Sequence, residues 1–200
     1  YTKETIIARE SIDKLIVVNG DKSYCQPCLS PVWDTGWIGQ VLLESNGSLD
    51  KTIEWLLKKE VRKKGDWIHN RKNLESGGWA FQYNNSFYPD VDDSALIGML
   101  LDRYNRANPS KKVSDSIERT RVWISGMQSK NGGWGSFDAD NTQYYLNYIP
   151  FADHGALLDP PTADVTARCV SFLAQLDNEK NNKKIVKAID YLISEQEKNG

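Results

Sequence analysis

The chain has 200 residues, of which 27 are acidic and 25 basic, so its formal net charge is −2. A nucleic-acid partner is disfavoured, because proteins that bind nucleic acids usually carry a strongly basic face. The length allows one sizeable core or a part of a larger one, and no apolar run reaches the roughly 18–20 residues that a membrane-spanning helix needs.

Seven segments are predicted as helices, and no segment shows the alternating pattern of a convincing strand. The predicted helices span residues 4–18, 35–45, 49–63, 93–106, 113–128, 164–176 and 183–196. The connections between them are rich in Gly, Pro, Asn and Asp. The two longest connections, 64–92 and 129–163, are of a length that is uncommon in structureless loops and usually functional.

Three of these helices form a repeat. The segments "EWLLKKE", "VWISGMQ" and "DYLISEQ" place aromatic residues at Trp55, Trp123 and Tyr191, each 68 positions after the one before. Two of the three helices run into a glycine-containing turn with a tryptophan, which is Trp67 after the first and Trp134 after the second. The periodic positions of these tryptophans indicate a structural role.

A second set of helices alternates with the first. "SPVWDTGWIGQVLL", "YPDVDDSALIGMLL" and "PPTADVTARCVSFL" share a proline, a short acidic turn and a hydroxyl residue, which is Thr35, Ser94 or Thr166. Proline with Asp, Ser or Thr is a helix-start signal. The second set has more small and apolar residues and suits an inner ring, whereas the charged first set suits an outer ring. We therefore predict an all-α fold, a partial α/α toroid.

About three helical hairpins are present, whereas a complete ring of this kind would need six. The sequence does not begin with Met, and its last residues, "SEQEKNG", fall inside a repeating unit. We interpret the chain as an internal fragment of a longer protein.

Three carboxylates, Asp90, Asp92 and Asp93, stand at the start of the middle inner helix. Alignment on the hydroxyl residue gives the other two inner helices one acid each, Asp34 and Asp164, which is ordinary capping. Three carboxylates in a poorly solvated cavity cannot all be ionised, because burial and like charges raise at least one pKa. The group that keeps its proton is a general acid. The alternative is a solvated cap with two surface acids.

Two other chemistries use clustered carboxylates. A magnesium–diphosphate site would also need Lys or Arg near the phosphate, and no such cluster flanks this motif. A glycosidase needs two separated carboxylates, of which Asp138 or Asp140 in "FDADN" would be the second. The 7 Trp, 9 Tyr and 5 Phe fit sugar stacking as well as a hydrocarbon pocket.

The cysteines favour neither a disulfide framework nor a metal site. Cys25 and Cys28 form a C-x2-C pair. The only other Cys and His residues of the sequence, which would have to complete a metal site, are Cys169, His69 and His154. Three cysteines fit a reducing compartment. We expect a pair of loop cysteines here and no metal.

Several motifs together resemble the squalene–hopene cyclase family across essentially the whole chain. They are "SPVWDT", "GGWAFQ", "YPDVDD", "GMQSKNGGWGSFDADN" and "PFADHGALLDPPTADVTAR". The resemblance implies two α/α-barrel domains in one longer chain. Residues 1–30 would be the junction from the preceding barrel domain, and residues 31–200 part of the catalytic barrel. The family's "QW" repeats would correspond here to Trp55, Trp123–Gln128–Trp134 and Tyr191–Gln196.

The resemblance also implies a mechanism, the conversion of squalene to hopene or hopanol in hopanoid biosynthesis. Asp92, the middle acid of the DxDD motif, would protonate the terminal alkene, with Asp90 and Asp93 as its partners. Aromatic faces stabilise the cations that follow. Residues matching family cavity positions are Trp33, Phe81 and Phe137.

Further expectations follow from the same resemblance. The "PFADHG" segment would form the channel constriction, with Phe151, Ala152 and His154 at its wall. The protein would be monotopic on the cytoplasmic face of a bacterial membrane, and squalene would enter it from that membrane. A homodimer is also possible for such a protein. No metal or organic cofactor is implied. We expect the fragment alone to be inactive, because part of the cavity wall is missing.

One residue departs from part of the family. Some members have His in "DVTAH", where this chain has Arg168. Arginine cannot relay a proton, so we expect it to pair with Asp90 or Asp93 and leave the remaining proton on Asp92. The alternative is a pair with Asp164, one helical turn earlier.

The sequence therefore predicts a class II terpene cyclase of the squalene–hopene type. Two alternatives stay open, namely a related cyclase acting on another polyprenyl chain and a non-catalytic helical-repeat toroid that only binds.

Overall fold

The computed structural model describes residues 2–26, 29–82, 85, 87–150, 157–176 and 182–198. The chain divides into two compact units, Tyr1–Ser30 and Pro31–Gly200. This division falls at the position where the sequence suggests a domain junction. That the first unit is the end of a preceding barrel stays a prediction.

The first unit contains one helix and a β-hairpin. Helix α1 (Lys3–Asp13) is followed by the antiparallel strands β1 (Ile16–Asn19) and β2 (Lys22–Cys25). The predicted helix over 4–18 is therefore too long, and the expectation of no strand is wrong here. The β-branched run before Asn19 favours a strand, and Gly20 turns the chain with a φ of 65°, as a two-residue hairpin loop requires.

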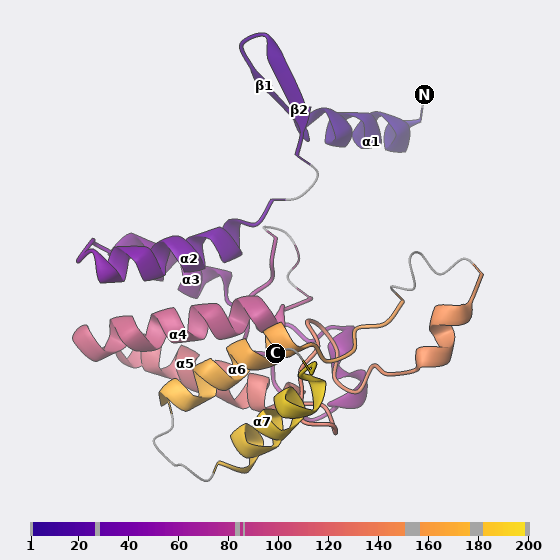
Figure 1. The fold of residues 1–200 in the computed structure, drawn as a ribbon. Coiled ribbons are helices and arrows are strands. Elements are labelled where there is room, and N and C mark those ends of the chain that lie inside the picture. Colours follow the sequence, from indigo (N-terminus) through magenta and orange to yellow (C-terminus); the bar gives the residue numbers. More distant parts are fainter. Residues whose placement is uncertain are drawn as a thin grey trace. The chain divides into compact units, whose positions relative to one another are not determined.

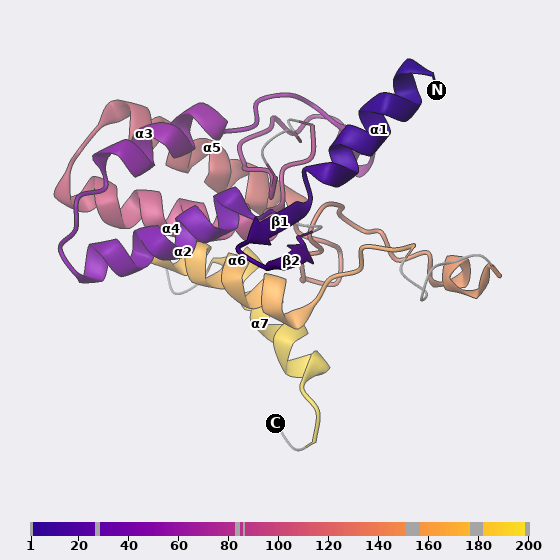
Figure 2. The same ribbon diagram turned by 90° about the horizontal axis from the view of Figure 1, so that it is seen from above.

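The second unit consists of alternating inner and outer helices in its described residues (Figures 1 and 2). The inner helices pack side by side and are α2 (Pro31–Glu44), α4 (Val91–Ala107) and α6 (Ala163–Leu176). The outer helices each pack against an inner one and are α3 (Asp50–Lys59), α5 (Lys111–Met127) and α7 (Lys183–Glu195). These helices confirm the six predicted in this unit, with ends that differ by up to four residues.

Two short 3-10 helices lie in the long connections, η1 (Asp66–Asn70) and η2 (Tyr144–Tyr148). The alternation of inner and outer helices agrees with the predicted partial α/α toroid. Among the described residues, no helix is long and apolar enough to cross a bilayer.

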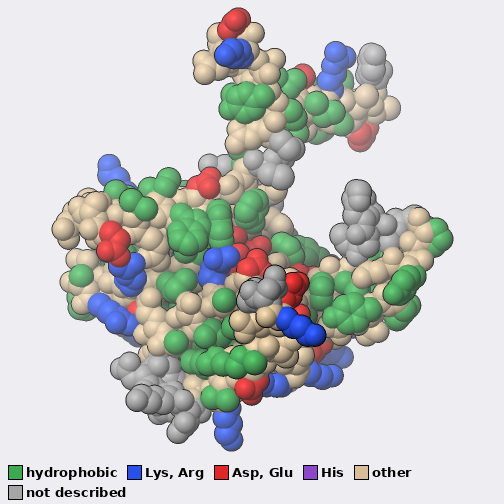
Figure 3. All heavy atoms as spheres, viewed as in Figure 1, with side chains coloured by type: hydrophobic (Ala, Val, Ile, Leu, Met, Phe, Trp, Pro, Cys, Tyr) green, Lys and Arg blue, Asp and Glu red, His purple; other side chains and the backbone are tan. Residues whose placement is uncertain are grey.

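Helix α2 carries exposed apolar side chains on one of its faces. Trp37, Ile38 and Val41 are 45%, 60% and 65% exposed, and Figure 3 shows hydrophobic side chains gathered over this helix. An inner helix of a complete ring has neighbours on both sides. The described unit provides one such neighbour for α2, namely α4.

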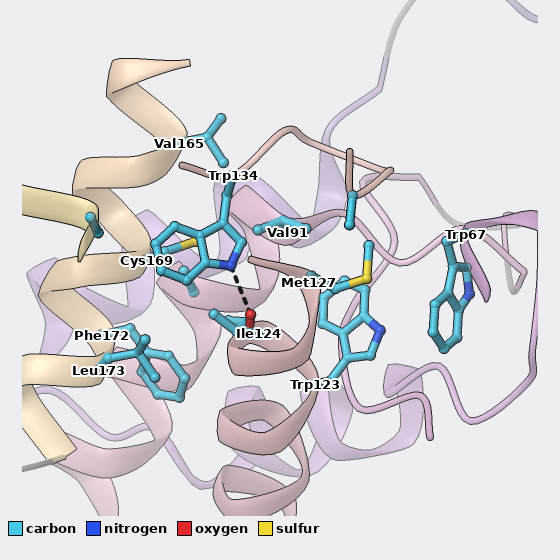
Figure 4. Close-up of a cluster of buried hydrophobic side chains, with 13 residues drawn as sticks. Trp67, Val91, Trp123, Ile124, Met127, Trp134, Val165, Cys169, Phe172 and Leu173 are labelled. Atoms are coloured by element: carbon cyan, nitrogen blue, oxygen red, sulfur yellow. Dashed lines mark hydrogen bonds between the residues drawn. The ribbon is translucent and has the colours of Figure 1, made fainter. Parts of the chain in front are cut away.

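The core between α4, α5 and α6 is built around buried aromatic side chains (Figure 4). Trp123 and Trp134 are fully buried, and Trp123 meets Trp67 edge to face at a centroid distance of 5.9 Å. Phe172 of α6 lies 2.5 Å from where a Cβ on Gly98 of α4 would be, so only glycine allows these two helices to approach this closely.

Two tryptophans repeat the same set of hydrogen bonds. Trp79 Nε1 donates to the Leu56 carbonyl, and Trp134 Nε1 donates to the Ile124 carbonyl, both at 2.7 Å. Leu56 and Ile124 are also 68 positions apart. Trp79 rather than Trp67 is thus the structural counterpart of Trp134, which corrects the repeat assigned from the sequence.

The inner helix starts repeat in the same way. The backbone N–H of Trp79 donates to the Ser94 hydroxyl, and that of Trp134 donates to the Thr166 hydroxyl. The sequence alignment on these hydroxyl residues is therefore confirmed. Each tryptophan connects the end of an outer helix to the start of the next inner helix, so the repeat fixes where the inner helices begin.

Gln128 extends the connection to the next outer helix. Its side-chain amide donates to the carbonyls of Gly132 and Lys184, at 2.8 and 2.9 Å. The corresponding residue one repeat earlier is Glu60, which accepts two hydrogen bonds from Arg119 and one from Ser116. Neighbouring outer helices are therefore held together by side chains at equivalent positions.

Substituting Trp134 by Phe should destabilise the protein more than substituting Trp123 by Phe. Both changes remove similar volume, but only Trp134 Nε1 has a hydrogen-bond acceptor among the described residues. The free energy of unfolding should fall by about 1 kcal/mol more for Trp134→Phe. Denaturant unfolding of the two variants in the full-length protein measures the difference, and equal losses would contradict the structural role of the Nε1–H bond.

Candidate active site

Asp90 caps the N-terminus of α4. Its Oδ1 accepts hydrogen bonds from the backbone N–H groups of Asp92 and Asp93, at 2.8 and 3.2 Å. Its own backbone N–H donates to the carbonyl of Trp79 at 2.7 Å. The first acid of the motif is therefore a helix cap, fixed in place by the repeat that ends at Trp79.

Asp93 is the most deeply buried of the three acids. Its exposure is 1%, and its Oδ1 has no hydrogen-bond partner among the described residues. Burial, together with the charges of Asp90 and Asp92, raises the pKa of Asp93 to about 8, although the charge of Arg168 acts in the opposite direction. Asp93 is thus protonated at neutral pH.

Asp90 is also shifted upward. Burial raises the pKa of Asp90 to about 7, against the two backbone hydrogen bonds that favour its charged form. The charges of Asp92 and Asp159 add to the rise. Because two neighbouring carboxyls both resist ionisation near neutral pH, the cluster holds at least one proton there.

Asp92 pairs with Arg168 from helix α6. The guanidinium donates to both carboxylate oxygens, with Nε on Oδ1 and Nη2 on Oδ2. The side chains of Asp92 and Arg168 are 19% and 23% exposed, so of the three acids only Asp92 is not buried. Figure 3 shows acidic side chains gathered beside a basic one near the adjoining ends of α4 and α6.

The expected partner of Arg168 is wrong in detail. The side chain does face the acid cluster, but it forms its hydrogen bonds with Asp92 rather than with Asp90 or Asp93. Asp90 is turned toward its own helix and Asp93 toward the core, so Asp92 is the acid that α6 can reach. Asp164 contributes a charge near Arg168, and its own pKa is lowered first by a hydrogen bond with Thr162.

Trp33 lies against this ion pair. The Arg168 guanidinium carbon is 5.0 Å from the centroid of the Trp33 ring, which is a cation–π distance. The structure therefore brings together Trp33, Asp92 and Arg168 from three successive inner helices. Trp33 also meets Trp37 edge to face, at 5.8 Å.

The other predicted cavity residues are placed less centrally. Phe137 is half-buried, and its ring meets the ring of Tyr88 edge to face at a centroid distance of 6.5 Å. Tyr88 precedes Asp90 by two residues. Phe81 is half-buried and follows Trp79 by two positions. The predicted channel residues lie outside the described residues, and they are Phe151, Ala152 and His154.

Asp159 is a half-buried loop acid that the sequence analysis did not identify. Its carboxylate accepts hydrogen bonds from the backbone N–H groups of Ser136, Phe137 and Asp138. The carbonyl of Ser136 in turn accepts from the N–H of Val91, at the start of α4. No local sequence pattern around "LLDPP" identifies this contact, because it joins Asp159 to a loop more than 20 residues earlier in the chain.

Among the described residues, the alternative acids and the cysteines do not form a second cluster. Asp140 pairs with Arg71 and accepts from the backbone N–H of Lys130, so its position is structural. Asp138 accepts from Asn141, and burial raises the pKa of Asp138. Within the described ranges, no three acidic, His or Cys side chains converge as metal ligands. Cys25 is exposed and Cys169 is buried, whereas Cys28 lies outside those ranges.

Comparisons with known proteins identify the family to which the chain belongs. The family model "Squalene-hopene cyclase C-terminal domain" matches residues 29–200. The chain is 50% identical over 203 residues to a squalene–hopene cyclase of Bradyrhizobium diazoefficiens and 49% identical over 210 residues to one of Zymomonas mobilis. These alignments cover 97% and 98% of the chain.

The same alignments cover 30% and 32% of the two relatives, so the chain spans about a third of their length. The matched range, residues 29–200, spans helices α2 to α7. The chain therefore belongs to the squalene–hopene cyclase family.

Proposed function

We propose that the protein containing this chain catalyses the proton-initiated polycyclisation of squalene to hopene or hopanol. The observation that carries this proposal is the acid cluster at the start of α4. Two of its carboxyls have raised pKa values, and the third is paired with an arginine at a partly open position. Such a cluster can supply a proton to a substrate that offers only a carbon–carbon double bond.

Asp92 is the carboxyl that delivers the proton in this proposal. It is the one acid of the three whose side chain is not buried, so a hydrocarbon in the cavity can contact it. A proton held by the cluster first passes to Asp92. The O–H bond formed there then breaks, a C–H bond forms at the end of the polyene, and a tertiary carbocation results, while the cluster is left with one proton fewer. The guanidinium of Arg168 then stabilises the carboxylate that the transfer leaves behind.

Asp93 and Asp90 keep a proton available beside Asp92. Asp93 is protonated at neutral pH because it is buried, and Asp90 titrates close to neutrality. After the transfer Asp92 is a carboxylate, and a protonated carboxyl beside it is less destabilising than a second carboxylate would be. The final carbocation loses a proton to a base, which gives hopene, or adds water and then loses a proton from the added water, which gives hopanol.

Aromatic side chains stabilise the cationic intermediates in this proposal. Trp33, Phe81 and Phe137 have π faces that attract positive charge through the ring quadrupole. Trp33 already has a cation against its face, namely Arg168. Its first role is therefore to hold the guanidinium that supports Asp92, and Phe81 and Phe137 are left to meet the developing cation.

Access from a membrane is part of the same proposal. Squalene is a hydrocarbon, so we propose a monotopic protein on the cytoplasmic face of a bacterial membrane, with Phe151, Ala152 and His154 at the channel. A homodimer is compatible with this placement. The chain alone should be inactive, because its α2 face is apolar and exposed where further hairpins would complete the cavity.

The alternatives differ in what the acid cluster does. A cyclase for another polyprenyl chain would use the same acids, and the product of turnover separates it from a squalene cyclase. A toroid that only binds has no use for a buried Asp93, one oxygen of which has no hydrogen-bond partner among the described residues, because such a group lowers stability. The acid cluster therefore favours an enzyme.

Replacing Asp92 by Asn should lower squalene turnover by at least about 100-fold, because an amide cannot donate the proton. Asp115→Asn is a matched control, since Asp115 is an exposed acid on the outer helix α5. Turnover and products are measured by gas chromatography with the full-length enzyme. Near-normal hopene formation by Asp92→Asn would contradict the role of Asp92 as the acid.

Replacing Asp93 by Asn should raise thermal stability at pH 7 while lowering activity. The folded pKa of about 8 lies above the unfolded value of about 3.9. Between these values the unfolded state releases its proton and the folded state keeps it, so the native Asp93 lowers stability as pH rises. The gain from Asn should therefore shrink toward pH 4.

Thermal unfolding of the full-length protein at pH 4, 5, 6 and 7 measures this gain. The Asp115→Asn variant again controls for the loss of one charge from a surface position. A gain that is constant with pH, or a loss that grows with pH, would show that Asp93 is ionised in the folded protein.

Replacing Arg168 by Gln should lower the maximal rate and extend activity to higher pH. The charge of Arg168 lowers the pKa of Asp93, so its removal raises that pKa and the cluster keeps its proton longer as pH rises. The rate falls because the carboxylate left on Asp92 loses its ion pair. A pH–rate profile checks both effects, and an unmoved alkaline limit would indicate a purely structural arginine.

A further inference from the structure

The loop around residues 134–141 is held by an acid from another part of the chain. Asp159 Oδ1 accepts from the backbone N–H of Ser136 at 2.9 Å. Its Oδ2 accepts from the N–H groups of Phe137 and Asp138, both at 2.6 Å. Three successive N–H groups therefore converge on a single carboxylate, which suits an ionised acid because it only accepts hydrogen bonds.

We propose that Asp159 is a positioning residue for the cyclisation, which fixes the segment 136–138 against the start of α4 and so sets the place of both the Phe137 ring and the acid cluster. This inference rests on the proposed function, since it assigns Asp159 a part in that reaction. It concerns a residue that touches neither Asp92 nor the substrate directly.

A single backbone hydrogen bond connects the clamped segment to the first turn of α4, which carries the acid cluster. The Ser136 carbonyl accepts from the backbone N–H of Val91 at 2.8 Å. Val91 is fully buried and lies between Asp90 and Asp92 in the sequence. The peptide group of Ser136 thus links Asp159 on one side to the first turn of α4 on the other, so a shift of Asp159 is passed to the acids.

The connection to the aromatic wall is equally short. Asp159 binds the N–H of Phe137, whose ring meets Tyr88 edge to face. Tyr88 is fixed at its other end, because its hydroxyl donates to Asp66 at 2.6 Å. A cation-stabilising ring must be placed within a fraction of an ångström to be effective, and a backbone clamp at its own residue provides that placement.

Gly135 is an independent sign of the clamp. A Cβ at this position would lie 2.5 Å from the Asp159 carbonyl oxygen and 2.8 Å from its Oδ2. The residue before the three donors must therefore lack a side chain for Asp159 to approach. Gly135→Ala should displace the carboxylate without changing its chemistry, which gives a second variant that tests the same contact.

Asp159 also acts on the cluster through its charge. Its negative charge is one of the causes that raise the pKa of Asp90, after burial and Asp92. Removing that charge lowers the pKa of Asp90, so the cluster releases its proton at lower pH. The alkaline limit of the pH–rate profile should therefore move to lower pH in Asp159→Asn, which a merely structural loop acid would not cause.

The test compares Asp159→Asn with Asp140→Asn in the full-length enzyme. Both residues accept backbone N–H groups in or next to the same loop, but Asp140 binds Lys130 and Arg71, away from α4. Asp159→Asn should lower turnover of squalene at least about tenfold, release incompletely cyclised products and move the alkaline limit downward. Asp140→Asn should lower thermal stability and leave the products and the alkaline limit unchanged.

Amide hydrogen exchange over residues 136–138 gives a readout that needs no substrate. Exchange should be faster in Asp159→Asn and Gly135→Ala than in the parent, and unchanged in Asp140→Asn. If the parent cyclises squalene and Asp159→Asn keeps its products and alkaline limit, the positioning role is overturned and the proposed function stands. If the parent leaves squalene unchanged, the proposed function and the role in cyclisation both fail, and the exchange rates decide whether the clamp exists.

Discussion

The structure of the site depends on keeping three carboxyl groups together at the start of one helix. Like charges at this spacing repel, and burial makes each of them costly. The chain meets this constraint by giving each acid a different environment. Asp90 caps α4, Asp92 is paired with Arg168, and Asp93 is buried and protonated. The cluster is therefore stable only with a proton in it, which is the property that an acid catalyst needs.

The tryptophan repeat explains why this arrangement can be held rigidly. Trp79 and Trp134 each connect the end of an outer helix to the start of an inner one, through the same two kinds of hydrogen bond. The scaffold is thus equivalent in both repeats, and only the side chains at the helix starts differ. Thr162 and Asp90 occupy equivalent positions at the starts of α6 and α4. The same scaffold therefore holds the three-acid cluster in only one of the two repeats. The raised pKa of Asp93 predicts that this residue lowers stability at neutral pH, which fits the catalytic role that we propose for the cluster.

The helices, the inner–outer alternation and the three-acid motif were predictable, because each depends on local spacing along the sequence. The hairpin at 16–25 was missed because its β-branched residues directly continue a helical pattern, and only Gly20 marks the turn. The counterpart of Trp134 was misassigned to Trp67, since two glycine–tryptophan turns lie within one long connection. The partner of Arg168 and the contacts of Asp159 depend on where α6 and a distant loop lie relative to α4, and no local pattern encodes that.

Infrared difference spectroscopy of the full-length enzyme tests the central claim most directly, because a protonated carboxyl has a C=O stretching band that a carboxylate lacks. A protonated Asp93 should give such a band at pH 7, and the larger part of the band should disappear with a midpoint near pH 8. Asp93→Asn should remove that part and leave only the smaller contribution of Asp90, which titrates near pH 7. The absence of any protonated carboxyl band at pH 7 in the unsubstituted enzyme, or a band that is unaffected by Asp93→Asn, would contradict the claim.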